Sequence, residues 1–282
     1  MSETEIIEQE QTYKPNTTNT ELPTDNINQG SVAIESARAR AEAQSKLLLA
    51  ASRPRNEARC IDKMVEAFSR PVLAEKAFYS YSRSGSTVRG LSIRAAEEMA
   101  RIWGNLEYGL RELSQDSGKS EMQAYCWDLE TNTMSVQNFT NKHARDVKNG
   151  VVRELTSLRD IYEINANMGA RRLRARILAI IPDYVVETVI EQAEKTLKGD
   201  STIPLKDRAN KMVAQFKKLG VTIEMIEERL GKSVSQMTPD DFVEYTGIYN
   251  SIKEKNQSVD DWFKNNREIK SDLGSVLDKL DE

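Results

Sequence analysis

The stretch NLEYGLRELSQDSGKSEMQAYCWDLETNTMSVQNFT, residues 105–140, alternates apolar and polar side chains in three successive runs. A repeat of two residues is the period of a β-strand, and the connecting segments DSGK and ETNT are rich in turn-forming residues. The alternating positions are Leu106, Tyr108 and Leu110 in the first run, Met122, Ala124 and Cys126 on one face of the second run, and Tyr125 and Trp127 on its other face. The simplest assembly of three such runs is an antiparallel three-stranded β-meander.

Helical patterns precede the meander. One predicted helix ends before Pro54 and a second ends before Pro71, because proline breaks a helix. A third runs from Ser92, a favourable N-cap residue, to Gly104. Between the second and third helices, the segment AFYSYSRSGSTVRG, residues 77–90, mixes aromatic residues with serine and glycine and predicts a short strand and a loop.

Helical patterns also follow the meander. We expect helix from about Val151 to Lys198, interrupted at Pro182, and then several short helices within residues 206–267. The predicted fold class is therefore α+β, with helices around a small antiparallel three-stranded β-meander, followed by a small all-α C-terminal domain. The predicted domain boundaries are 1–30 for a disordered acidic tail, 31–200 for the core and 201–282 for the helical C-terminal domain.

Charge is distributed unevenly along this chain, whose net charge is -4. Residues 1–30 hold six acidic side chains and one lysine, a charge of -5, and residues 221–282 hold fourteen acidic and eight basic side chains, a charge of -6. Residues 31–220 consequently carry +7. A basic middle between acidic ends favours a polyanion as the partner of the middle and other proteins as partners of the ends.

The sequence lacks the residues that are characteristic of several classes of function. Cys60 and Cys126 are too few for a disulfide framework, and a single histidine, His143, cannot form an ordinary zinc site with two separated cysteines. The two GKS sequences, at 118–120 and 231–233, lack the first glycine of a phosphate-binding loop. We therefore expect neither an enzyme nor a cofactor. A metal-dependent nuclease that uses the scattered carboxylates stays as an alternative.

The sequence also shows no pattern of a membrane-spanning helix. No apolar run approaches the ~18 residues of a spanning helix. The first ten residues, MSETEIIEQE, are acidic and unlike a signal peptide. We expect a cytoplasmic protein with no membrane partner.

The segment GARRLRARILAIIPD, residues 169–183, concentrates positive charge beside an apolar run. Its four arginines are Arg171, Arg172, Arg174 and Arg176. On a helix, the second and fourth lie one turn apart on one side of an apolar stripe, and the first and third lie near the other side. No acidic residue occurs between Glu163 and Asp183, so ion pairs within the helix cannot neutralise the cluster. The cluster therefore favours contact with a nucleic-acid backbone, and the alternative is a surface helix paired with acids elsewhere.

More basic residues precede this cluster. From residue 142 to residue 176, nine basic side chains face four acidic ones, a net charge of +5. The candidates for DNA contact in this part are Lys142, Arg145 and Arg159.

A second candidate surface is the segment FYSYSRSGSTVRGLSIR, residues 78–94. Its candidate contacts are Tyr79, Tyr81, Arg83, Arg89 and Arg94. Exposed aromatic rings between arginines suit single strands, since each unpaired base can stack on a ring for about 1–3 kcal/mol. Core packing of the tyrosines is the alternative. The absence of a helix-turn-helix, zinc finger or basic zipper pattern favours binding along the backbone without base reading.

The chain resembles the phage-type single-strand annealing proteins of the RecT/Redβ superfamily. The resemblance lies in the layout and in two stretches, ARRLRARILAIIPDYVVETVIEQA at 170–193 and KKLGVTIEMIEERLGKSVSQMTPDDFVEYTGIYNSIK at 217–253. It covers roughly residues 35–265. The N-terminal half departs from the best-known members, so the resemblance is to a divergent branch.

The resemblance implies binding of single-stranded DNA and annealing of complementary strands without ATP, in phage homologous recombination inside a bacterial host. It also implies a homo-oligomer, either a ring or a helical filament. A phage exonuclease or a host single-strand-binding protein is the implied partner of the C-terminal domain. The four clustered arginines, Arg159 and Lys142 match the basic stretch of the family by position. A non-catalytic adaptor that binds an acidic protein is the remaining alternative.

Overall fold

The structure is a computed structural model that describes residues 29–83, 86–147, 151–199, 203–254 and 257–263. Nearly all of the acidic tail predicted for residues 1–30 lies outside these residues, as do the end of the chain and the side chain of Arg83. The chain divides into two compact units, of which the first ends at Lys46 and the second begins at Leu47. The functional domain boundaries predicted near residues 30 and 200 stay predictions.

The first helices end where the prolines predict. Helix α1, Gln29–Ser52, ends before Pro54, and α2, Glu57–Phe68, ends before Pro71. Pro71 itself begins the single turn α3, Pro71–Ala74. The side chain of Asn56 accepts a hydrogen bond from the backbone of α2 and satisfies one of its free N–H groups.

The aromatic segment that follows forms a hairpin rather than a strand and a loop. Strand β1, Phe78–Arg83, pairs antiparallel with β2, Ser86–Leu91. The prediction of a loop is therefore wrong for residues 86–90, because pairing with β1 satisfies the backbone of a serine- and glycine-rich stretch. Helix α4, Ile93–Trp103, comes next, and the Ser92 hydroxyl accepts a bond of 3.2 Å from the Ala95 N–H, as predicted for its cap.

The predicted β-meander is confirmed. Strands β3, Leu106–Asp116, β4, Lys119–Asp128, and β5, Thr133–Lys142, form an antiparallel sheet in the order β3-β4-β5. The turns contain Gly118 and Asn132 with φ of 83° and 54°, the left-handed region that glycine and asparagine tolerate best. The face of β4 that carries Met122, Ala124 and Cys126 is buried.

A short ribbon separates the meander from the next helix. Strand β6, Ala144–Val147, pairs antiparallel with β7, Val151–Glu154. Helix α5, Leu158–Leu178, begins only after this ribbon, so the prediction of helix from Val151 is wrong by about two turns. The backbone bonds between the two strands outweigh the weak helical pattern of this stretch.

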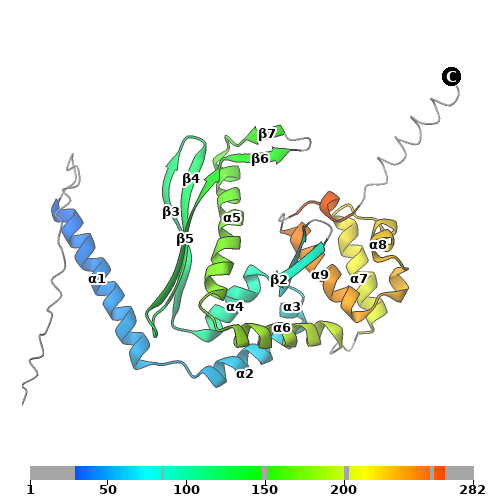
Figure 1. Cartoon of the computed structure of the whole chain (residues 1–282), viewed down its shortest axis with the longest axis horizontal. Coiled ribbons are helices and arrows are strands. Elements are labelled where there is room, and N and C mark those ends of the chain that lie inside the picture. The colour runs from blue at the N-terminus through cyan, green and yellow to red at the C-terminus, as the bar shows by residue number, and fades with distance from the viewer. Residues whose placement is uncertain (1–28, 84–85, 148–150, 200–202, 255–256, 264–282) are drawn as a thin grey trace, which may run out of the picture. The chain divides into compact units, whose positions relative to one another are not determined.

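Helix α5 lies along the β3-β4-β5 sheet and also contacts α4 (Figure 1). Gly169 allows this approach, because a Cβ at that position would clash with the Leu110 side chain on β3. The chain breaks at Pro182, as predicted, and continues as α6, Asp183–Lys198, which contacts α2. The sheet and α4 thus pack against α5.

The last helices follow the predicted caps. They are α7, Leu205–Lys218, α8, Ile223–Leu230, and α9, Pro239–Lys253, with short 3-10 turns at η2, Val234–Gln236, and η3, Val259–Asp261. Thr238 caps α9 and Pro239 occupies its first position, as the sequence predicts. The rings of Phe216 and Phe263 meet edge to face with centroids 5.7 Å apart.

One hydrophobic core runs through the second unit, from Cys60 on α2 to Phe263 near the end of the described chain. Helix α9 contacts both β1 and α6, and its Asn250 amide donates 2.9 Å to the Phe78 carbonyl oxygen. The fold is thus mixed α+β with small antiparallel sheets. No helix among the described residues is long and apolar enough to cross a membrane.

Candidate nucleic-acid interface

Helix α5 carries its arginines on both sides of a buried apolar stripe, as predicted. The stripe residues Leu173 and Ile177 are buried against the sheet and α4. Arg171 and Arg174 extend on the side of α4, β1 and α9. Arg172 extends toward the sheet, where its guanidinium carbon lies 4.8 Å from the ring centroid of Phe139. The two sides of the helix therefore place their guanidinium groups in different surroundings.

Arg174 stacks on an aromatic pair of β1. Its guanidinium carbon lies 3.9 Å from the ring centroid of Tyr79, a close cation–π contact. The Tyr79 ring is in turn stacked with Tyr81, with centroids 6.0 Å apart and an angle of 11° between the planes. Residues two apart on a strand share a face, so β1 presents both rings toward α5.

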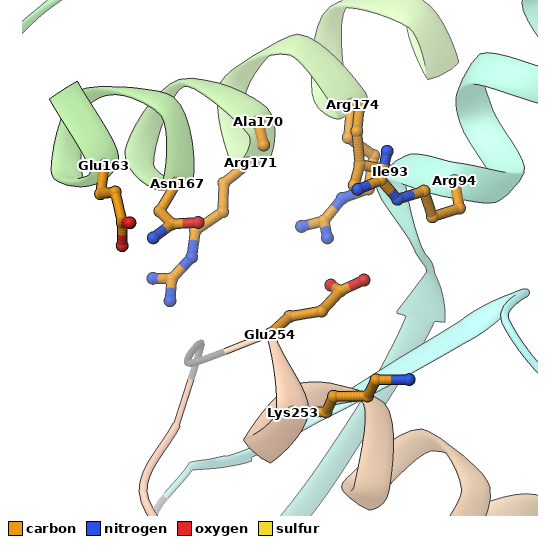
Figure 2. Close-up of a pocket in the computed structure, with 9 residues that line it drawn as sticks. All are labelled: Ile93, Arg94, Glu163, Asn167, Ala170, Arg171, Arg174, Lys253 and Glu254. Carbon is orange, nitrogen blue, oxygen red and sulfur yellow. The ribbon is translucent and has the colours of Figure 1, made fainter. Parts of the chain in front are cut away.

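A cavity of about 310 Å³ opens beside these arginines, and we call it the arginine pocket. Figure 2 shows its side chains, which come from α4, α5 and α9. Its charged members are the cations Arg94, Arg171, Arg174 and Lys253 and the carboxylates Glu163 and Glu254. Four cations facing two carboxylates leave the pocket positive, which favours an anionic ligand.

A second cavity of about 380 Å³ shares Arg171 and Arg174 with the arginine pocket, and we call it the tyrosine hollow. Tyr79, Tyr81 and Gln257 complete its walls, together with Ser80. The Gln257 amide oxygen accepts a bond of 3.1 Å from the Ser82 N–H. Because a backbone N–H can only donate, this bond fixes the orientation of the amide, whose nitrogen remains as a donor.

Burial makes Arg172 and Arg174 costly to hold in their charged form. Desolvation is the largest cause that lowers the pKa of Arg174, and the neighbouring charge of Arg171 adds to it, while Tyr79 acts in the opposite direction. Desolvation and Arg171 likewise lower the pKa of Arg172. The Nε atoms of Arg172 and Arg176 are buried and have no hydrogen-bond partner among the described residues. Partly desolvated cations of this kind occur preferentially at binding sites.

The pocket contains residues that the sequence did not indicate. Glu254 and Lys253 come from the end of α9, about eighty positions beyond Arg174 in the sequence. The Glu254 carboxylate points toward the Arg174 guanidinium (Figure 2) and raises its pKa, opposing the larger effect of burial. No local pattern could have placed these residues, since their position depends on how α9 packs on β1.

Among the other predicted contacts whose side chains the structure describes, Arg94 lines one of these two cavities and the rest lie outside both. Arg94 lines the arginine pocket and approaches Glu97 at 3.5 Å. Arg89 is directly opposite Ser80 and therefore on the other face of the hairpin, where it stacks on Phe78 and pairs with Glu194. The structure thus separates Arg89 from the tyrosines with which the sequence grouped it.

The basic residues ahead of the cluster are exposed. Arg159, at the start of α5, approaches Glu163 at 3.6 Å. Lys142 ends β5, and Arg145 lies on β6. The backbone of Arg83 pairs with Ser86 at the end of the β1–β2 hairpin. The side chains of Arg159, Lys142 and Arg145 line neither cavity.

The remaining polar candidates have structural surroundings. His143 is 5% exposed, and its Nε2 lies 2.8 Å from the Ser120 hydroxyl, which is itself buried. In the first GKS sequence, Gly118 lies in the β3–β4 turn and the next two residues begin β4. The second GKS sequence follows α8. Among the residues that the structure describes, no three His, Cys, Asp or Glu side chains gather into a group that could hold a metal ion.

Comparison with protein families, with characterised proteins and with solved structures finds no match to this chain. The interpretation of the site therefore rests on its own geometry and charge.

Proposed function

We propose that this protein binds single-stranded DNA across the arginine pocket and the tyrosine hollow, without ATP, and that it anneals complementary strands in phage recombination. One observation carries the proposal: Arg171 and Arg174 line both cavities, so that guanidinium groups adjoin a stacked tyrosine pair. This combination of cations and aromatic faces is typical of sites for single strands. The resemblance to the RecT/Redβ superfamily agrees with it.

The proposed mechanism is electrostatic and geometric. Phosphates bind Arg171 and Arg174 in competition with the Glu254 carboxylate, whose charge acts on Arg174. Charge-assisted bonds to guanidinium are strong and directional. An unpaired base stacks on the exposed part of the tyrosine pair, which a base held within a duplex cannot do. A strand held in this way presents its remaining bases to a second strand. No covalent bond is broken in this process.

Annealing along a strand requires several copies of the protein, and we propose a ring or helical filament. Leu158 and Tyr162, at the start of α5, are 78% and 73% exposed and provide apolar surface for a neighbouring copy. Helices α7–α9 would act as an all-α domain that contacts a phage exonuclease or a host single-strand-binding protein in the bacterial cytoplasm.

The test is a titration of fluorescent single-stranded and double-stranded oligonucleotides at several salt concentrations. We expect tighter binding of the single strand and a log–log salt slope of about -0.7 per phosphate neutralised. The variant Arg171→Gln/Arg174→Gln should bind about ten- to hundredfold more weakly, with a shallower slope. The control Arg70→Gln/Arg101→Gln removes the same charge from exposed arginines that pair with Glu66 and Glu98.

An annealing assay without nucleotide then tests the second half of the proposal. Accelerated pairing of complementary oligonucleotides in EDTA supports it. Magnesium-dependent cleavage of the DNA would instead identify a nuclease. A protein that binds no oligonucleotide would be an adaptor, and the proposal would be wrong.

A further inference from the structure

We propose that the β6–β7 ribbon forms a second contact for the phosphates of a bound strand, through Arg145 and its cross-strand partner Arg153. The inference rests on the proposed function and extends the path of the DNA beyond the arginine pocket. It starts from a different observation, the arrangement of like charges across paired strands.

Arg145 and Arg153 are direct cross-strand partners in the ribbon. Both side chains are exposed, and no described residue forms an ion pair with either. Like charges directly opposite each other destabilise a strand pair. The cost is comparable in size to the gain from a favourable cross-strand pair, which is about 0.2–1 kcal/mol. Glu154 cannot relieve this repulsion from its own place, because neighbouring residues on a strand point to opposite faces.

A second like-charge pair lies where the meander passes into the ribbon. Lys142, the last residue of β5, is the direct partner of Lys119 on β4. Both lysines are exposed, and Lys119 is 3.6 Å from Glu121. Two successive cation pairs, three positions apart along the chain, therefore follow the same connection from β5 to β6.

The ribbon gains no stability from this arrangement. Two-stranded ribbons are marginally stable on their own, and opposite charges at these positions would strengthen the pairing. A ligand with regularly repeated negative charges suits the arrangement in the ribbon, because its charges can pair with Arg145 and Arg153. A phosphodiester backbone has this property, and the net charge of +5 across residues 142–176 complements it.

The position of the ribbon fits a continuous path. The ribbon leads directly into α5, whose first residue, Leu158, precedes Arg171 by thirteen positions (Figure 1). A helix rises about 1.5 Å per residue, so this part of α5 is about 20 Å long. At about 3.4 Å per phosphate of a stacked strand, the interval corresponds to roughly six nucleotides. A strand of about 16 nucleotides is thus long enough for both sites, and one of about four is not.

The test compares these two oligonucleotide lengths for wild-type protein and the variant Arg153→Glu. The variant replaces the cation pair by an ion pair with Arg145, so the ribbon should remain paired. We expect about tenfold weaker binding of the long oligonucleotide, a salt slope shallower by about 1.4, and unchanged binding of the short one. The control Arg101→Glu makes the same charge change on α4 and should leave both affinities unchanged.

The outcomes separate the two proposals. Absence of oligonucleotide binding by the wild type would overturn the proposed function and this inference with it. Wild-type binding of both lengths with no loss in Arg153→Glu would overturn the ribbon contact alone. An altered oligomeric state with unchanged DNA affinity would also overturn it, because the cations would then face a second copy. If Arg153→Glu unfolds, the variant Arg145→Gln/Arg153→Gln replaces it with the same expectation for the long oligonucleotide.

Discussion

Arg174 occupies the centre of the proposed site, between the Tyr79 ring and the Glu254 carboxylate. A guanidinium in this position is partly desolvated and yet has an anion nearby. In the proposed mechanism, Glu254 is a competitor that a phosphate must displace. The affinity for DNA at this site would be the difference between the contact of the arginines with phosphate and their contact with Glu254. It should therefore be sensitive to the Glu254 carboxylate alone.

Replacing Glu254 by Gln should raise the affinity for single-stranded oligonucleotides about three- to tenfold, because the competing charge is removed from partly desolvated guanidinium groups. Fluorescence anisotropy at low salt measures the change. The control Glu187→Gln alters the net charge equally at an exposed position of α6. Equal affinities for both variants would show that Glu254 does not compete with DNA.

Tyr81 should supply a stacking surface, since the Arg174 guanidinium covers a face of its neighbour Tyr79. Tyr81→Ala should weaken single-strand binding by about 1–3 kcal/mol, the usual value for one stacked base. Tyr81→Phe keeps the ring and should bind like the wild type. A similar loss in both variants would indicate that the hydroxyl group, rather than the ring, makes the contact.

At the scale of elements, the close approach of α5 to the sheet positions the arginines. Gly169→Ala should destabilise the protein by about 1–3 kcal/mol, because the added methyl group clashes with Leu110. Urea denaturation measures the loss. Gly199→Ala is the control, since an added Cβ there meets nothing within 4 Å. A neutral Gly169→Ala variant would mean that the contact between α5 and β3 is looser than described.

A buried ion-pair network connects the chain ahead of α2 to the β4–β5 turn. The Arg55 guanidinium donates 2.8 Å and 2.6 Å to the two Asp128 oxygens and 2.9 Å to Glu130, and it is 8% exposed. Arg55→Met should destabilise the protein by about 3–5 kcal/mol at neutral pH, because two carboxylates lose their partner. Arg70→Met, which breaks only an exposed pair with Glu66, should cost about 1 kcal/mol or less.

The effect of Arg55→Met should depend on pH. Burial alone would raise the pKa of Glu130, but the Asn105 amide and Arg55 together lower it. A lowered pKa stabilises the folded state above the ordinary carboxyl range, and this stabilisation is lost as the pH falls through the lowered value. The difference in unfolding free energy between wild type and variant should therefore shrink on acidification. A difference that does not change with pH would contradict the ionic account.

Local sequence patterns predicted most of the helices and strands. Strict alternation, proline breaks and capping residues determine secondary structure within a few positions of themselves, so they can be recognised without knowledge of the fold. The ribbon of β6 and β7 was missed because residues 142–154 alternate weakly and precede a strong helical pattern. The pairing of β2 with β1 was missed for a similar reason. Arg174 and Tyr79 were both predicted as contacts, but their stacking depends on tertiary packing. Glu254 and Gln257 enter the site only through the docking of α9 on β1.

At the scale of the whole molecule, the second unit has one continuous core, so a truncation cannot remove some of its helices without disturbing the others. Helix α9 contacts β1 and supplies Glu254 to the arginine pocket, so removing the last helices would also change the proposed site. Binding measurements on the full chain with point variants are therefore more informative than truncations. With a basic middle between acidic ends, the proposed binding of DNA should weaken strongly as salt is added.

The central claim is that a single strand lies against Tyr79 and Tyr81. Photocrosslinking of the full chain to a bromodeoxyuridine oligonucleotide, followed by trypsin and mass spectrometry, tests it most directly. Trypsin cleaves after Lys76 and Arg83, so both tyrosines fall in the single peptide 77–83. The account predicts that this peptide carries a principal crosslink, and that Arg171→Gln/Arg174→Gln reduces its yield. Crosslinks confined to other peptides, with none on residues 77–83, would contradict it.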